Sequence, residues 1–187
     1  WINLDQSCPR WIHHGEEFLW SSERDGRWRL ERRSRDGRLI AVVTLGKIGY
    51  RSLLGVDELR REAWVAGGPE PTESHAYASP LDPSSWSAGR RTTEPGLHAL
   101  TRSRKSRIYV DAWSSLDREP RWLVKNGDGG VLGELKSVAE KPLLTPNVEI
   151  LRVGASPQLC AAVVRPGAFR SEEHTSELQS PCNLVCR

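Results

Sequence analysis

Residues Phe18–Thr44, FLWSSERDGRWRLERRSRDGRLIAVVT, contain the clearest structural signal of the chain. Two copies of Arg-Asp-Gly, at Arg24–Gly26 and Arg35–Gly37, separate three short segments that contain apolar residues. Asp-Gly between such segments indicates a tight hairpin turn, because both residues tolerate the positive φ angles that the turn requires. The stretch therefore predicts a three-stranded antiparallel meander with strands over Phe18–Ser22, Arg27–Arg32 and Leu39–Thr44.

Similar strand and turn patterns recur downstream, separated by segments rich in Gly, Pro, Asp and Ser. Three sets of strands end near Thr44, Thr93 and Leu135, which lie 49 and then 42 residues apart. Four strands in about 40 to 50 residues is the period of a β-propeller blade, whereas a β-sandwich does not favour a repeat of this length. The later candidate strands are Leu53–Val56, Ala63–Ala66, Ser74–Ser79, Gly89–Thr93, His98–Thr101, Arg107–Ser114, Arg121–Lys125 and Val131–Leu135.

We therefore predict an all-β fold, a partial β-propeller of about three four-stranded antiparallel blades. The chain has eight tryptophans, and large rings at strand positions fill the space between stacked sheets. Core packing is favoured over the alternative, an aromatic cage for a ligand. The tryptophans that we place in blade cores are Trp20, Trp28, Trp64, Trp113 and Trp122.

Composition argues against a membrane span and against a nucleic-acid partner. No apolar run approaches the ~18 residues that a membrane-spanning helix needs. The net charge is only +3, because 27 Lys and Arg are interspersed with 24 Asp and Glu. The densest basic cluster coincides with an expected hairpin turn and lacks interleaved aromatics, which favours a solvated turn over a nucleic-acid patch. This cluster consists of Arg102, Arg104, Lys105 and Arg107.

Neither a metal site nor a cofactor site is predicted. Cys8 and Cys160 lie far from the other cysteines, and the pair Cys182 and Cys186, with His174 nearby, lacks the second pair of ligands that a zinc site needs. We place His13–His14 in a strand, where adjacent side chains point to opposite faces, and expect both at the surface. The chain begins at Trp1 and contains no Met, so we expect it to be a piece of a longer protein.

No catalytic nucleophile is predicted either. The sequence contains no Gly-x-Ser-x-Gly, the motif that places a serine on a strand-to-helix elbow. The nearest approach, Gly154-Ala155-Ser156, lacks the second Gly and falls in an expected hairpin turn, so no helix N-terminus supplies oxyanion donors. Ser156 is therefore interpreted as a turn residue.

Four segments, in order, match a known family pattern: FLWSSERDGRWRL from Phe18, LLGVDE from Leu53, PTESHAYASPLD from Pro71 and YVDAWSSLD from Tyr109. Together they resemble the propeller domain of the dipeptidyl peptidase IV family, within the prolyl oligopeptidase superfamily of S9 serine peptidases. The family shows a Trp-x-Ser-Glu-Arg-Asp-Gly segment, a Gly-x-Asp-Glu pair, a His-Leu-Tyr strand before Leu-Asp, and a Tyr-Val-Asp segment.

The resemblance extends past the repeats. Val148–Phe169 contains VEILRVG, a turn and LCAAVVRPGAF, and it is similar to the first β-hairpin of the family's α/β-hydrolase domain. The resemblance thus implies a partial propeller over residues 1–135, a linker over 136–147 and the start of the hydrolase domain over 148–169. Arg170–Ser180, RSEEHTSELQS, resembles the translation of a sequencing-library adapter. We expect residues 170–187 to be non-native; the alternative is a native polar loop or short helix.

What the resemblance implies is a fragment of a dipeptidyl peptidase IV-like serine peptidase. Such enzymes release N-terminal Xaa-Pro or Xaa-Ala dipeptides, with the propeller gating access of peptide substrates; a homodimer of the parent enzyme is also compatible with the family. This chain lacks the Ser, Asp and His of the triad, so we predict that it is inactive alone, with no catalytic, cofactor or metal residues. The rival interpretation is a non-catalytic propeller that serves as a protein-binding scaffold, which would have no need of the hairpin in Val148–Phe169.

The resemblance also draws attention to Glu16–Glu17. Propellers of the family contribute two Glu residues that bind the free α-amine of the substrate. Their pair occurs in an earlier propeller segment, however, whereas Glu16–Glu17 immediately precede the strand at Phe18. We therefore predict a solvated turn here.

Overall fold

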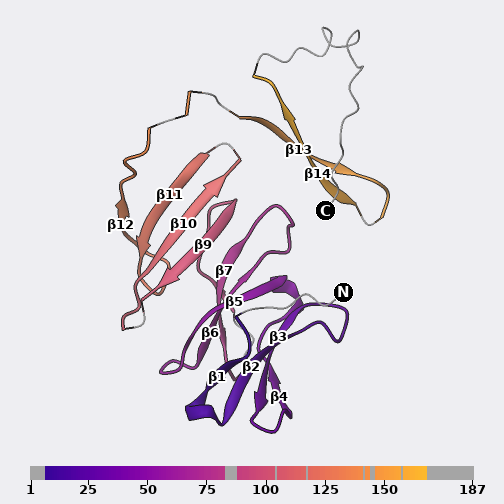
Figure 1. The fold of residues 1–187 in the computed structure, drawn as a ribbon, viewed down its shortest axis with the longest axis vertical. Helices are drawn as coiled ribbons and strands as arrows, with labels where there is room; N and C mark the ends of the chain where they lie inside the picture. Colours follow the sequence, from indigo (N-terminus) through magenta and orange to yellow (C-terminus); the bar gives the residue numbers. More distant parts are fainter. Residues whose placement is uncertain are drawn as a thin grey trace. The chain divides into compact units, whose positions relative to one another are not determined.

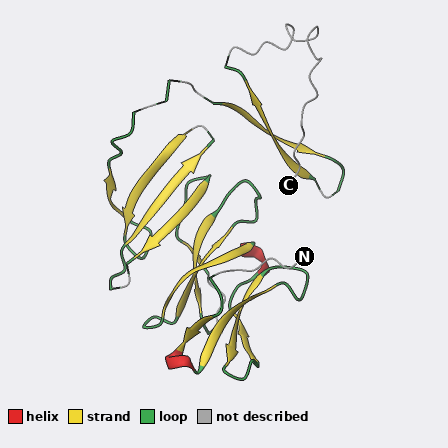
Figure 2. Cartoon of the chain, viewed as in Figure 1, coloured by secondary structure: helices red, strands yellow, loops and turns green. Residues whose placement is uncertain are grey.

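The structure, a computed structural model, describes residues 7–82, 88–103, 105–116, 118–140, 142–143, 146–156 and 158–167. Its chain divides into two units, residues 1–139 and 140–187. In the described part, all helical structure is confined to two short 3₁₀ helices, η1 (His13–Gly15) and η2 (Gly46–Ile48), and the rest is strand and loop (Figure 2). The predicted all-β fold class is therefore confirmed. The expectation for residues 170–187 lies outside the described residues.

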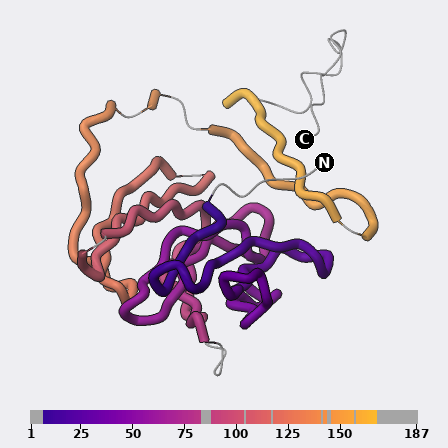
Figure 3. Tube along the Cα trace, turned by 60° about the horizontal axis from the view of Figure 1, so that its bottom comes forward, coloured from indigo at the N-terminus to yellow at the C-terminus, as the bar shows by residue number. Residues whose placement is uncertain are grey.

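Unit one contains three four-stranded antiparallel sheets, each built from strands that follow one another in the sequence (Figure 1). Figure 3 traces the chain as it turns back between successive strands. The first sheet comprises β1 (Arg10–Ile12), β2 (Glu17–Ser22), β3 (Arg29–Ser34) and β4 (Leu39–Val42). The second comprises β5 (Tyr50–Asp57), β6 (Glu62–Gly67), β7 (His75–Pro80) and β8 (Gly89–Arg90). The third comprises β9 (Leu97–Arg102), β10 (Tyr109–Ser115), β11 (Arg118–Lys125) and β12 (Val131–Leu135).

The two Asp-Gly sites form the predicted turns. Gly26 and Gly37 have φ angles of +75° and +88°, in the left-handed region that L-residues with a side chain rarely adopt. The N–H of Gly37 donates to the carbonyl of Ser34 at 2.8 Å, which closes the turn between β3 and β4. A Cβ at Gly37 would meet nothing within 4 Å, so the requirement for glycine there is conformational rather than steric.

The first sheet has one strand more than the sequence predicted. β1 pairs with β2 in the register Trp11↔Phe18, and these two rings lie 5.1 Å apart. Three residues are too few to display an alternating pattern, which is why the strand was missed. The expectation that His13 and His14 lie in a strand is wrong: they form η1 with positive φ angles of 48° and 55°.

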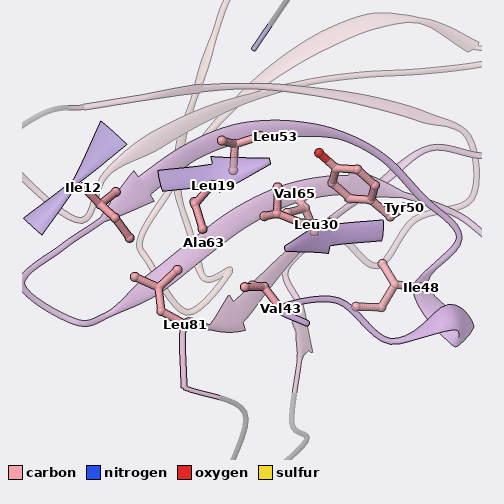
Figure 4. Packing of buried hydrophobic residues seen from close by; sticks show 10 residues of the cluster. All are labelled: Ile12, Leu19, Leu30, Val43, Ile48, Tyr50, Leu53, Ala63, Val65 and Leu81. Carbon is pink, nitrogen blue, oxygen red and sulfur yellow. The ribbon is translucent and has the colours of Figure 1, made fainter. Parts of the chain in front are cut away.

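The main hydrophobic core lies between the first and second sheets (Figure 4). β6 reads EAWVAG, and its residues are buried on both faces of the sheet. Ala63 and Val65 face the first sheet, whereas Trp64 packs against Tyr109 of the third. A strand between two sheets needs apolar residues on both sides, which accounts for its nearly continuous apolar sequence. The core residues are Ile12, Leu19, Leu30, Val43, Ile48, Tyr50, Leu53, Ala63, Val65 and Leu81.

The tryptophans divide into two groups. Trp64 and Trp113 are only 2% and 5% exposed, as predicted for blade cores, and Trp28 packs partly against the main core. Trp20 and Trp122, by contrast, are 41% and 37% exposed, so their assignment to blade cores is wrong. Trp20 alternates along β2 with the buried Leu19, and therefore points to the opposite face of the sheet.

Unit two contains one hairpin among its described residues, formed by β13 (Asn147–Val153) and β14 (Leu159–Arg165). The strands are antiparallel, with Val148 opposite Val164 and Val153 opposite Leu159. Ser156 lies in the connecting turn and is exposed.

Replacing Leu30 by Ala should lower the free energy of unfolding by about 2–5 kcal/mol, because Leu30 is fully buried in the main core and the substitution leaves a cavity. Urea unfolding followed by tryptophan fluorescence measures the change. Leu59→Ala is the matched control, since Leu59 is 95% exposed. Equal stability of the two variants would contradict the placement of the core.

Candidate functional site

Buried polar side chains gather where the second and third sheets meet. His75, Thr92, His98, Asp111 and Lys125 are all at most 6% exposed. Glu73 and Arg90 contact His75 at the edge of the group. We call these seven residues the inter-sheet polar cluster. Buried polar groups are tolerated where each finds a hydrogen-bond partner, so the geometry of the cluster determines what it can do.

Asp111 is the centre of the cluster. His98 Nδ1 lies 2.9 Å from its carboxylate and Lys125 Nζ lies 2.7 Å away. Strand register explains why these three side chains meet. Asp111 is opposite Leu100 of β9 and Leu123 of β11. His98 lies two residues from Leu100, and Lys125 lies two residues from Leu123, so both are diagonal neighbours of Asp111 on the same face of the sheet. Burial alone would raise the pKa of Asp111, but the hydrogen bonds and charges of the two cations outweigh it and hold that pKa below its usual range.

His75 forms the second half of the cluster. Its Nε2 lies 2.7 Å from Glu73 Oε2, and its Nδ1 lies 3.0 Å from Thr92 Oγ1. An Arg90 nitrogen lies 3.1 and 2.9 Å from the two ring nitrogens. The centroids of the His75 and His98 rings are 5.2 Å apart. Burial lowers the pKa of His75, and the charges of Arg90 and His98 act in the same direction, against the hydrogen bond to Glu73.

Nothing in this arrangement equips the cluster for nucleophilic catalysis. His98 and Asp111 form a His-carboxylate pair of the kind that activates a serine in hydrolases. Here, however, the other ring nitrogen of His98 lies 2.8 Å from the backbone carbonyl of Glu94, which leaves it no hydroxyl or thiol to activate. The cluster therefore has a structural role: Asp111 joins three strands of the third sheet, and the ring of His98 contacts that of His75 across the interface.

Arg102 lies in the same interface. Its guanidinium carbon stands 4.5 Å from the centroid of the Trp64 ring, and a guanidinium nitrogen lies 3.6 Å from Asp57. The prediction that Arg102 belongs to a solvated turn is therefore wrong, because a cation stacked on a buried ring fixes β9 against the second sheet. Arg107 is 2.8 Å from Asp128 in an exposed ion pair, and Lys105 is exposed. Arg104 lies outside the described residues.

The two glutamates ahead of Phe18 differ from each other. Glu16 is exposed and lies 3.8 Å from Arg35, as expected of a solvated turn. Glu17 begins β2, and its carboxylate lies 3.4 Å from Arg32 Nε and 3.3 Å from His13 Nδ1. For Glu17 the expectation of a solvated turn is wrong, because strand alternation directs its side chain toward β3 and η1.

The other predicted candidates are not assembled into a site. Cys8 Sγ lies 3.4 Å from Ser21 Oγ, and Cys160 is in β14. Within the described ranges, no group of three His, Cys, Asp or Glu residues could hold a metal ion. A search of the same ranges finds no helix that is long and apolar enough to cross a membrane. His174, Cys182 and Cys186 lie outside the described residues.

Substituting Asp111 by Ala should cost about 3–5 kcal/mol of unfolding free energy, because it leaves the buried cations His98 and Lys125 without their shared anion. Chemical denaturation measures the loss. Asp128→Ala removes the exposed partner of Arg107 and should cost no more than about 1 kcal/mol. If Asp111→Ala and Asp128→Ala lowered the free energy of unfolding by the same small amount, the cluster would not be needed for stability.

Tyr109 should ionise later than an ordinary tyrosine. Burial, together with the charge of Asp111, raises its pKa to about 12. Its neutral form therefore stabilises the fold fully below about pH 10, and this contribution is lost as the pH rises through about 12. A spectrophotometric titration of phenolate should contain a component that ionises near pH 12, and Tyr109→Phe should remove one tyrosine's absorbance change from it. Simultaneous ionisation of all three tyrosines near pH 10 would contradict the burial.

Comparison with known proteins places this geometry in a family. The model of the family described as "Dipeptidyl peptidase IV (DPP IV) N-terminal region" matches residues 1–120. Dipeptidyl peptidase 4 of Porphyromonas gingivalis, a solved crystal structure, is similar with a TM-score of 0.70 at 20% identity. The match covers 86% of this chain and 24% of that one, so the chain spans about a quarter of its length, and the likeness shows the fold. Because the family model extends over more than half of the residues, the chain belongs to the family of the dipeptidyl peptidase IV N-terminal region.

Proposed function

We propose that this chain forms part of the propeller wall of a dipeptidyl peptidase IV-like serine peptidase, and that the wall gates the access of peptide substrates. Membership of the family over residues 1–120 carries the proposal. Three consecutive four-stranded sheets support it, since sheets of this kind are the blades of a propeller. In this assignment residues 1–135 are propeller and 136–147 are linker.

A gating role agrees with the packing inside unit one. The second sheet is covered on one face by the main core and on the other by Trp64, Tyr109 and the inter-sheet polar cluster. Sheets packed in this way make a rigid wall, because closely packed interiors resist deformation. Such a wall would restrict a catalytic chamber to extended peptide ends and exclude folded proteins.

The hairpin of β13 and β14 favours a peptidase over a protein-binding scaffold. It belongs to a separate unit from the three sheets. We assign residues 148–169 to the start of an α/β-hydrolase domain, whose later part would supply the nucleophile, the acid and the histidine. The proposed product is an N-terminal Xaa-Pro or Xaa-Ala dipeptide.

A longer polypeptide, expressed from the source locus with its flanking coding sequence, should release the chromophore from an Xaa-Pro chromogenic substrate. The 187-residue chain should not, because among its described residues no hydroxyl or thiol stands beside the His98 and Asp111 pair. The test compares the initial rates of chromophore release by the purified longer polypeptide and the purified 187-residue chain.

The matched control is the longer polypeptide with its elbow serine changed to Ala, which should lose the turnover. Blocking the substrate's α-amine, or replacing the peptide by a folded protein, should also abolish cleavage if the propeller gates access. Turnover by the 187-residue chain itself, or a longer protein with no peptidase activity, would overturn the proposal.

A further inference from the structure

The ring of His98 lies between two hydrogen-bond acceptors. One ring nitrogen lies 2.9 Å from the carboxylate of Asp111 and the other lies 2.8 Å from the carbonyl oxygen of Glu94. Both neighbours are acceptors: the carbonyl has no proton, and the cations beside Asp111 keep its carboxyl ionised. A neutral imidazole would direct one lone pair at an acceptor, so the geometry favours donation by both nitrogens.

His75 has partners that suit either protonation state. Glu73 accepts a proton from Nε2 whether the ring is neutral or charged. The hydroxyl of Thr92 accepts from the N–H of Ala76 at 3.2 Å, and it can donate to a bare Nδ1 or accept from a protonated one. Of the two histidines, only His75 has a ring nitrogen that can gain a proton. Glu73 and Thr92 can pair with the ring in either state, whereas the guanidinium of Arg90 can only donate and would lose its acceptor.

The positive charges around His75 disfavour its protonation. Arg90 from β8 lies against the ring of His75, and the tilted ring of His98 from β9 is 5.2 Å away between centroids. Lys125 from β11 contacts Asp111, the partner of His98. The anions that face this group are Glu73 and Asp111. Protonation of His75 adds one positive charge to the cluster. Like charges in a buried site are weakly screened and repel strongly.

We propose that His75 and His98 form an acid-sensitive joint between the second and third sheets: protonation of His75 adds a positive charge against Arg90 and beside the His98 ring, and weakens the packing of β7 against β9. The inference concerns the propeller itself and does not depend on the peptidase proposal. In an assembled propeller the joint would let mild acid loosen one blade contact and leave the others in place.

The pH range of the effect follows from the direction of the shift. Burial lowers the pKa of His75 in the folded chain below the ordinary value of about 6.5 that it has when unfolded. The unfolded chain therefore takes up this proton first as the pH falls. Neutral His75 therefore makes its full contribution to the stability of the fold above about pH 6.5. This contribution is lost as the pH drops through the lowered pKa of His75 in the folded chain.

Hydrogen–deuterium exchange of the full chain tests the joint. Exchange is measured by mass spectrometry at about pH 7.5 and about pH 5.5, which lie on either side of the ordinary pKa of histidine. After correction for the intrinsic pH dependence of exchange, peptides from β7 and β9 should exchange faster at the lower pH. Peptides from β3 should not change, because its arginines pair with Glu17 of β2, with Glu31 of β3 itself and with Asp82 rather than with a histidine pair.

His75→Gln keeps a polar side chain that cannot be protonated, and it should abolish the acid-induced increase in β7 and β9. Arg90→Gln removes one opposing cation and should reduce the increase, which provides a second test if His75→Gln folds poorly. His14→Gln, at an exposed histidine, is the matched control and should behave as the unmodified chain. The proposal is overturned if β7 and β9 show no increase, if β3 shows the same increase, or if both Arg90→Gln and His75→Gln retain it in full.

Discussion

The burial of β6 on both faces is the constraint on which the rest of unit one depends. One strand supplies Ala63 and Val65 to the main core and Trp64 to the contact with the third sheet. Because successive side chains in a strand point to opposite faces, the two contacts cannot be adjusted independently. A shift of β6 by a single residue would turn Trp64 toward the first sheet and Ala63 and Val65 toward the third, which would disrupt both contacts. The sheets are therefore fixed in order and register by the central one.

The two interfaces of the second sheet are chemically different. Its contact with the first sheet is mainly aliphatic, whereas its contact with the third contains the inter-sheet polar cluster beside Trp64 and Tyr109. Apolar contacts are non-directional, so they tolerate small sliding movements. The hydrogen bonds of Asp111 to His98 and Lys125 join three strands within the third sheet, and they hold the His98 ring where it meets His75 of the second.

Local sequence signals predicted the strands and turns well, and predicted the side-chain environments less well. The Asp-Gly turns at Gly26 and Gly37 form as expected, because positive φ is a property of the residues at the turn itself. The sequence predicts Trp20 and Trp122 in blade cores, but both side chains are exposed. Strand position alone does not say which face of a sheet is covered. The sequence places Arg102 in a solvated turn, because the basic cluster coincides with an expected hairpin and lacks interleaved aromatics, yet its guanidinium lies over the ring of Trp64 from another sheet.

Consecutive residues are enough to predict the fold class, the number of blades and the family, because turn chemistry, strand spacing and the ordered segments that resemble the family are all local features. The inter-sheet polar cluster, by contrast, follows from the packing of distant strands. His75 lies in β7 of the second sheet, and Glu73 lies in the turn before β7. His98, Asp111 and Lys125 come from three strands of the third sheet. The meeting of these residues depends on strand register and on the stacking of two sheets, and neither is encoded in the residues next to them.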